Sequence, residues 1–210
     1  MPENLFSLTN ILSLLALFSF VVFLLYIKKI KLSTSAIVKI SLAIALSVVL
    51  DKITLFKMAQ GGSVTPGSMI PIIIISFIYG PQVGMLSGFL FGFMNLILGG
   101  SIVHPVQLLL DYPLAFMLIG LSGYLKPNYK VDTTSKARIK IILAVLIASI
   151  GRLLCHFLSG IIFFSEYAGE MNPYLYSLIY NGSFLSVEFL ICSIIMCILP
   201  LKRLIYNIKN

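Results

Sequence analysis

The chain has 210 residues, of which 59% are hydrophobic and only 10% are charged. A soluble domain carries roughly a quarter charged residues and under half apolar ones, whereas residues 58–110 contain no Lys, Arg, Asp or Glu at all. This composition excludes a soluble enzyme, a disordered tail and a disulfide scaffold, and it predicts a protein embedded in a membrane.

Seven apolar runs are predicted to cross the membrane as helices, because this path places the basic segments on one side of the bilayer. They cover residues 5–27, 36–52, 67–80, 83–98, 105–125, 139–164 and 175–200. The predicted fold class is therefore all-α, a polytopic membrane helical bundle. The sequence shows no internal repeat and no second domain.

The net charge of +8 indicates membrane orientation and not a nucleic-acid partner. Twelve of the fifteen basic residues lie in or beside three segments: 28–39, the loop 126–140 and the tail 202–209. Short loops rich in Lys and Arg stay cytoplasmic, so these segments and the C-terminus are expected inside the cell. The first run, 5–27, has no cleavage signal after it and is expected to be retained, with the N-terminus outside.

Small residues recur at four-residue spacing on two of the predicted helices. Gly84, Gly88 and Gly92 share one face of the run 83–98, and Ser41 and Ala45 form a similar pair on 36–52. This spacing lets helix backbones approach closely in lipid. For the glycines we expect packing against another helix of the same chain.

Four ionisable residues lie inside the predicted helices: Asp111, Arg152, His156 and Glu188. Each costs roughly 2.5–3.5 kcal/mol on insertion scales, and such residues are usually retained for function. Pro113 is expected to kink the helix next to Asp111.

Two helices carry polar and aromatic residues toward the predicted outer face. Arg152, His156, Gly160 and Phe164 are spaced four apart, so they share a helix face that we interpret as a cavity wall. The last run begins with Tyr174, Tyr176, Tyr180 and Asn181. The tyrosines suit an aromatic belt at the membrane interface, but an amide such as Asn181 needs hydrogen-bonding partners.

These residues predict a small-ligand pocket near the outer membrane face. Asp111 would balance a cation, and aromatic faces would hold it by cation–π contact. The alternative is an Asp111–Arg152 ion pair that only joins two helices. The sequence has no phosphate-binding loop, no hydrolase or protease motif and only two histidines. We therefore expect no catalytic residue, no metal and no cofactor, and we interpret the three scattered cysteines as buried small hydrophobic residues.

Several stretches then resemble one known family. They are 57–71 (KMAQGGSVTPGSMIP), 104–116 (HPVQLLLDYPLAF) with 120–123 (GLSG), 151–160 (GRLLCHFLSG) and 176–182 (YSLIYNG). In this order, over roughly residues 36–200, they are similar to the thiamine-specific substrate-binding (S) subunits of energy-coupling factor (ECF) transporters, the ThiT family. The resemblance implies a six-helix core at residues 35–210, preceded by an additional unit at 1–34 that contains the first span and a basic linker.

The resemblance also implies roles for individual residues. Asp111 would bind the aminopyrimidine of thiamine beside Tyr112, and Gly160 would let the ligand approach the backbone. The other expected contacts are Arg152, His156, Phe164 (where Trp is common in the family), Tyr176 and Asn181. Phe56 is the nearest candidate for a lid aromatic in the first external loop.

The implied partners are thiamine, membrane lipid, a transmembrane coupling subunit docked at Ser41 and Ala45, and two ATPase subunits. The implied location is a prokaryotic plasma membrane, and no nucleic acid is expected. Two alternatives stay open: an S subunit for another vitamin such as riboflavin, or a secondary transporter or intramembrane enzyme that uses Asp111 and Arg152.

Overall fold

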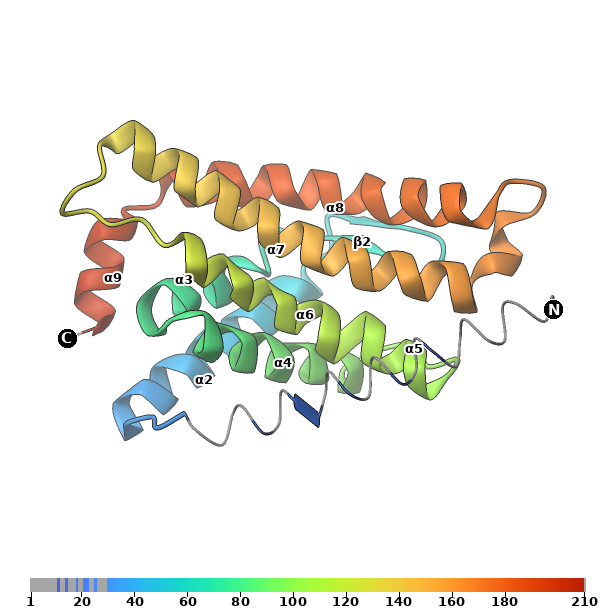
Figure 1. The fold of residues 1–210 in the computed structure, drawn as a ribbon, viewed down its shortest axis with the longest axis horizontal. Helices are drawn as coiled ribbons and strands as arrows, with labels where there is room; N and C mark the ends of the chain where they lie inside the picture. The colour runs from blue at the N-terminus through green and yellow to red at the C-terminus, as the bar shows by residue number, and fades with distance from the viewer. Residues whose placement is uncertain are drawn as a thin grey trace.

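The computed structural model describes residues 30–209 and, before them, residues 11, 14, 18, 21, 22 and 25. The predicted first span, 5–27, thus lies outside the continuously described part. The long helices run lengthwise beside one another, a short hairpin lies along them toward one end, and the C-terminal helix crosses the other end (Figure 1). This is the all-α bundle that the composition predicts, with one two-stranded sheet added.

The elements follow the predicted order with small shifts in their ends. They are α2 (Thr34–Lys52), β1 (Phe56–Lys57), β2 (Ser63–Val64), α3 (Ile70–Tyr79), α4 (Pro81–Ile97), a continuous helical segment made of α5 (Pro105–Leu109), η1 (Leu110–Leu114), α6 (Ala115–Met117) and η2 (Leu118–Leu125), then α7 (Thr134–Phe163), η3 (Ser165–Ala168), α8 (Pro173–Ile198) and α9 (Leu201–Lys209).

Local sequence explains where the helices begin. Ser33, Thr133 and Asn172 cap α2, α7 and α8, because each side-chain oxygen accepts a backbone N–H of the first turn. Proline occupies the first turn of α4, α5 and α8. The N–H groups of a first turn have no acceptor within the helix, so the lack of an N–H in proline costs nothing there.

Four helical segments among the described residues are long and apolar enough to cross a membrane: 34–52, 105–125, 134–163 and 173–198. The predicted span 67–80 is different, since α3 has ten residues and therefore a length of about 15 Å, half of a hydrocarbon core of about 30 Å. Eight of its ten residues are buried. α3 is thus shorter than the predicted run and largely enclosed by its neighbouring helices, and its crossing of the membrane stays a prediction.

The glycine face of α4 packs as predicted. A Cβ on Gly84, Gly88 or Gly92 would collide with Ser76, with the backbone of Phe116, or with the backbone of Tyr112, respectively. α4 therefore lies directly against the segment 105–125, and Phe91 meets Phe116 edge-on at 4.7 Å between ring centroids. The prediction for the cysteines is confirmed for Cys155 and Cys192, which are buried, whereas Cys197 is half-buried.

The segment 105–125 changes its helical pitch at the residues that matter most for the site. Residues 110–114 form a π-turn that contains Pro113. Proline has no N–H to donate and its ring disturbs the preceding turn, and an added residue per turn widens the helix there. The predicted kink takes this form, and it presents Asp111 on the inner wall of the bundle.

The hairpin forms the outer rim of the bundle. β1 and β2 pair antiparallel, with Phe56 opposite Val64 and Lys57 opposite Ser63. Gly61 makes the turn at a φ of 97°, a conformation open mainly to glycine. The chain then enters α3 through Thr65 and Ser68, both of which are buried.

α9 is an element that the sequence interpretation described only as a basic tail. Pro200 ends α8, and the chain turns so that α9 lies across the end of the bundle (Figure 1). Leu201 and Ile205 are buried in the main core, and Lys39 of α2 donates to the carbonyl of Ile208. The amphipathic sequence of α9 thus docks it as a short interfacial helix.

Candidate functional site

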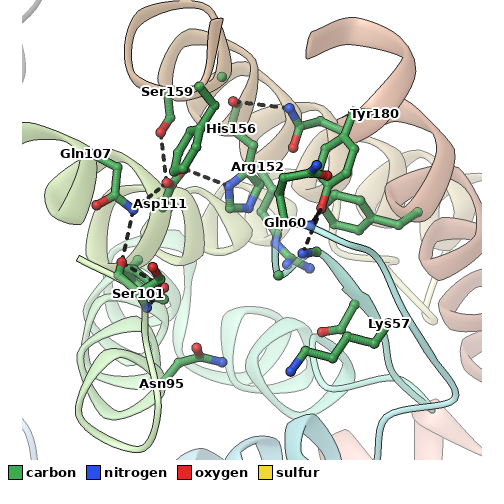
Figure 2. A pocket seen from close by; sticks show the side chains of 18 of the residues that line it. Lys57, Gln60, Asn95, Ser101, Gln107, Asp111, Arg152, His156, Ser159 and Tyr180 are labelled. Carbon is green, nitrogen blue, oxygen red and sulfur yellow. Dashed lines mark hydrogen bonds and ion pairs between the residues drawn. The ribbon is translucent and has the colours of Figure 1, made fainter. Parts of the chain in front are cut away.

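A cavity of about 530 Å³ opens beside the hairpin, and it brings together all eight residues predicted to bind substrate. Figure 2 shows it from close by. Its walls come from the ends of α2 and α4, the hairpin, the segment 105–125, α7 and α8. The eight lining residues are Asp111, Tyr112, Arg152, His156, Gly160, Phe164, Tyr176 and Asn181.

Asp111 is the best-held carboxylate of the cavity. Its Oδ2 accepts hydrogen bonds from Gln107 Nε2 at 2.7 Å and from Ser159 Oγ at 2.8 Å, and its Oδ1 lies 3.1 Å from His156 Nδ1 (Figure 2). Donors to a carboxylate stabilise its charged form. Helix α7 and the segment around the π-turn therefore hold this carboxylate in a fixed orientation at the cavity wall.

The second ring nitrogen of His156 has no hydrogen-bond partner in the part of the chain that the structure describes. A carboxylate only accepts hydrogen bonds, so Nδ1 carries the proton that faces Asp111. In the neutral ring that donates from Nδ1, Nε2 carries the lone pair, and Nε2 is buried with no partner among the described residues. An unpaired buried polar atom costs free energy, so a ligand that donates a hydrogen bond here gains from it.

Asn181 adds a further acceptor. Its Nδ2 donates to the carbonyl oxygens of Ser177 at 2.9 Å and His156 at 3.2 Å. These two bonds fix the orientation of the amide, because a flipped amide would set oxygen against two carbonyls. Oδ1 then remains available. Gly160 lies close beside this group, where a Cβ would collide with Ser177.

Arg152 is neutralised within the protein. Its guanidinium donates to Glu188 Oε2 at 2.6 Å, and both side chains are buried. Glu188 also accepts from Thr65 Oγ1 at 2.6 Å, and the guanidinium lies 4.6 Å from the centroid of the Phe116 ring. The alternative of an Asp111–Arg152 ion pair is therefore wrong, because α8 supplies a nearer carboxylate that is better enclosed.

Aromatic side chains form the outer part of the cavity. Tyr176 and Tyr180 lie one turn apart on α8, with their rings stacked at 6.0 Å, and Phe164 lines the cavity from the end of α7. The Tyr180 hydroxyl accepts the N–H groups of Gln60 and Gly62, both at 3.1 Å. Tyr180 thus holds the hairpin against α8, which an interfacial belt would not require, whereas Tyr174 is exposed outside the cavity.

The hairpin contributes polar groups to the cavity, and the expected lid aromatic does not join them. Phe56 is 60% exposed and is not among the lining residues. It is in β1 opposite Val64, while the next pair of the hairpin, Lys57 and Ser63, lines the cavity. Tyr112 closes another part of the rim, where its hydroxyl accepts the N–H of Ser101 at 2.6 Å.

Several polar lining residues were not assigned to the site from the sequence, among them Asp51, Asn95, Gln107 and Ser159. Gln107 precedes Asp111 by one turn and Ser159 follows His156 by three residues, so helical spacing could have assigned both to this face. The Asp51–Asn95 contact, 2.6 Å between Oδ2 and Nδ2, joins α2 to α4 and leaves no local signal. Within the described residues, no group of three or more His, Cys, Asp or Glu side chains is placed to hold a metal ion.

The predicted docking pair lies away from the cavity. Ser41 and Ala45 are exposed on α2, among the apolar side chains of Ile37, Leu42 and Val49 that also face outward. Nothing in the described chain covers this face. Its use by a partner remains a prediction.

The chain is similar to known thiamine transporters in both sequence and structure. The sequence model of the family described as thiamine transporter protein (Thia_YuaJ) matches residues 37–207. Thiamine transporter ThiT of Bacillus subtilis is 39% identical over 171 residues, which are 78% of this chain and 88% of the relative. ThiT of Lacticaseibacillus paracasei is 32% identical over 123 residues, 54% of this chain and 61% of the relative. A solved structure of ThiT from Listeria monocytogenes gives a TM-score of 0.71 at 26% identity, over 80% of this chain and 93% of that one.

Proposed function

Because the chain belongs to the thiamine transporter protein family, we propose that it is the thiamine-binding membrane subunit of an ATP-driven vitamin uptake transporter. It is a multi-pass membrane protein with an all-α fold. Thiamine consists of a flat aminopyrimidine ring, which donates hydrogen bonds through its amino group, and a flat thiazolium ring with a fixed positive charge. A binding site for it needs acceptors, a negative charge and aromatic surface.

The observation that carries the proposal is the set of acceptors around Asp111. Its carboxylate is fixed by Gln107 and Ser159, and His156 Nε2 is a buried atom without a partner among the residues that the structure describes. Asn181 contributes a third acceptor, since its donor side is occupied. In the proposed complex the aminopyrimidine donates to this set, and Asp111 adds the negative charge that favours a cation.

The aromatic and glycine residues suit the shape of the ligand. Phe164, Tyr176 and Tyr180 line the outer part of the cavity, where their faces would stack on the two rings and attract the thiazolium charge. Gly160 leaves space at the wall, since a side chain there would displace Ser177. Arg152 would not repel the cation, because Glu188 already neutralises it.

Transport requires partners in this proposal. We expect the cavity to open to the outside and the basic loop and C-terminus to face the cytoplasm of a prokaryotic cell. The chain has no phosphate-binding loop of its own, so ATP hydrolysis would come from two ATPase subunits. A coupling subunit would dock on the exposed α2 face at Ser41 and Ala45. The relatives are named as transporters, and this chain would catalyse no covalent reaction.

Titration of the purified protein with thiamine tests the proposal. The chain contains no Trp, so isothermal calorimetry is a better readout than intrinsic fluorescence. We expect saturable one-to-one binding that Asp111→Asn weakens strongly. Glu166→Gln removes the same charge from an exposed residue outside the cavity and should bind like the wild type. Absence of saturable binding at micromolar thiamine, or equal binding by Asp111→Asn, would contradict the assignment.

Two alternatives have clear tests of their own. A site for riboflavin would not need Asp111, so a ligand panel separates the two vitamins by their dependence on this residue. A secondary transporter that works through Asp111 and Arg152 would move thiamine in vesicles that contain no ATPase subunit. The Arg152–Glu188 pair counts against that second reading, since Arg152 is buried and already paired.

A further inference from the structure

A second recess lies at the opposite end of the bundle from the ligand cavity. It is a groove of about 910 Å³ between the segment 129–141, the end of α8, and α9. Figure 1 shows α9 crossing this end, with the loop before α7 beside it. The groove shares no lining residue with the first cavity, so the proposed vitamin site does not account for it.

The groove carries an excess of positive charge. Four cations line it: Lys130, Arg138, Lys202 and Arg203. None of them forms an ion pair with another described residue. These charges come from two segments about seventy residues apart in sequence, so the fold itself brings them together.

Among the described residues that line the groove, one is acidic, and its charge is already neutralised. Asp132 accepts a hydrogen bond from Lys140 Nζ at 2.7 Å and lies 3.6 Å from Lys136 Nζ. Neither of these lysines is a lining residue. Asp132 is thus held from outside the groove, and the four lining cations keep their full attraction for an anion.

Apolar residues line the same groove between the charges. Ile141, Leu199, Leu201 and Ile205 contribute to it, together with two tyrosines, Tyr129 and Tyr206. A free inorganic anion makes no use of such a surface. A molecule with a phosphate at one end and a hydrocarbon chain at the other matches both parts.

The depth of the groove in the membrane suits this type of molecule. α7 has 30 residues, which is about 45 Å of helix, whereas the hydrocarbon core is about 30 Å thick. Its first turns, with Arg138, therefore project to the level of the lipid headgroups. α9 lies across the same level with Leu201 and Ile205 buried and with Lys202 and Arg203 exposed, as an interfacial helix does.

We propose that this groove binds an anionic phospholipid, with the phosphate between the cations and an acyl chain along the apolar residues. Basic recesses on the cytoplasmic side of membrane proteins are suited to such headgroups. The proposal concerns the lipid and does not depend on which vitamin the first cavity takes. Its place in the cytoplasmic leaflet rests on the orientation proposed above.

Lipid retention by the full-length protein in detergent tests the proposal. Native mass spectrometry would compare phosphatidylglycerol with zwitterionic phosphatidylcholine. We expect one retained phosphatidylglycerol, with its preference over phosphatidylcholine reduced about fivefold by Arg138→Gln or Arg203→Gln, since each cation near such a headgroup contributes on that scale. Lys31→Gln removes an exposed basic residue outside the groove and should leave retention unchanged.

Three outcomes would overturn the proposal. Equal retention of the two lipids, or an equal effect of Lys31→Gln, would mean that the attraction is a general effect of net charge. Displacement of phosphatidylglycerol by inorganic phosphate alone would mean that the apolar residues play no part. Unchanged lipid retention in Arg138→Gln and Arg203→Gln, with loss of assembly with the coupling subunit, would assign the groove to a protein partner. Thiamine titration of the same variants checks that the fold is intact.

Discussion

Arg152 forms its ion pair with Glu188, at 2.6 Å, and leaves Asp111 to His156. The two carboxylates inside the bundle therefore have different tasks. Glu188 is 1% exposed and is also bonded to Thr65 and Ser68, so it serves the internal structure. Asp111 lines the cavity with its charge uncompensated by Arg152, which is the arrangement that a cationic ligand requires.

Removing the Glu188 charge should destabilise the protein more than any exposed change. Glu188→Gln leaves Arg152 as an unpaired charge in a buried site, and breaking such a pair costs about 3–5 kcal/mol. We expect a marked fall in the melting temperature in detergent, while Glu166→Gln on the surface has no effect. Replacing both partners, as Arg152→Met with Glu188→Met, should recover much of the loss. A double variant as unstable as Glu188→Gln would argue against an electrostatic cause.

Each hydrogen-bond donor to Asp111 should contribute separately to the affinity for thiamine. Ser159→Ala and Gln107→Leu each remove one hydrogen bond to the carboxylate, and a bond to a charged group contributes about 1.5–3 kcal/mol. We expect thiamine binding to weaken about tenfold or more in each variant, measured by calorimetry. Ser186→Ala, which removes an exposed hydroxyl bonded within α8, is the matched control. Affinities equal to the wild type would show that Asp111 needs no fixed orientation.

Gly160 of α7 and Gly182 of α8 differ in the space available for an added side chain. A Cβ on Gly160 would collide with Ser177 and lie 3.3 Å from Asn181 Nδ2, whereas a Cβ on Gly182 has nothing within 4 Å. Gly160→Ala should therefore shift the α8 wall and weaken thiamine binding by about tenfold or more, since overpacking costs about 1–3 kcal/mol. Gly182→Ala should bind normally and gain stability by up to about 1 kcal/mol, because alanine favours the helix. Equal thiamine affinity in the two variants would mean that α8 can shift to accommodate the added methyl group without a cost to binding.

The loop before α7 gives a prediction for pH. The hydrogen bond from Lys140 lowers the pKa of Asp132 below its ordinary value of 3.8, with further help from the Asn128 N–H. A carboxyl whose pKa is depressed in the folded state stabilises the fold above its unfolded pKa, and that contribution disappears as the pH falls through the folded value. The melting temperature of Asp132→Asn should thus lie below that of the wild type by a constant amount from pH 8 to 5. The difference should shrink only below about pH 4, and a loss already at pH 6 would contradict this cause.

Much of the architecture could be predicted from residue patterns, because apolar runs and their flanking charges are local signals. The helical segments at 105–125, 134–163 and 173–198 follow such runs closely. α3 covers only Ile70–Tyr79 of the predicted span 67–80, because apolar composition does not mark the residue at which a buried helix begins. The position of α9 could not be predicted, because it depends on packing against α3 and on the hydrogen bond from Lys39. Neither contact leaves a local pattern in the sequence.

The site residues also differ in whether a local sequence pattern could assign them. Residues spaced four apart on one helix, such as His156 and Gly160, could be assigned to one wall from the sequence. Pairings between helices could not, so the sequence left Asp111 open as a partner for Arg152, whereas in the structure α8 supplies Glu188. The prediction of Phe56 as a lid aromatic was wrong for a related reason. A short hairpin sets which side chains turn inward through its register, and in this register Phe56 is left outside.

Tyr180 should control how long a ligand stays in the cavity. Its hydroxyl is the acceptor for two hairpin N–H groups, of Gln60 and Gly62, and the hairpin forms the rim through which the cavity opens. Tyr180→Phe keeps the ring that stacks on Tyr176 but leaves both N–H groups without an acceptor, which favours opening of the hairpin. We expect thiamine to dissociate about tenfold faster in stopped-flow experiments with little change in the association rate, and the amides of residues 58–63 to exchange faster with deuterium. Tyr174→Phe alters an exposed tyrosine of the same helix and should change neither. Faster exchange without faster dissociation would separate the hairpin from ligand retention, and it would leave the aromatic wall as the source of the residence time.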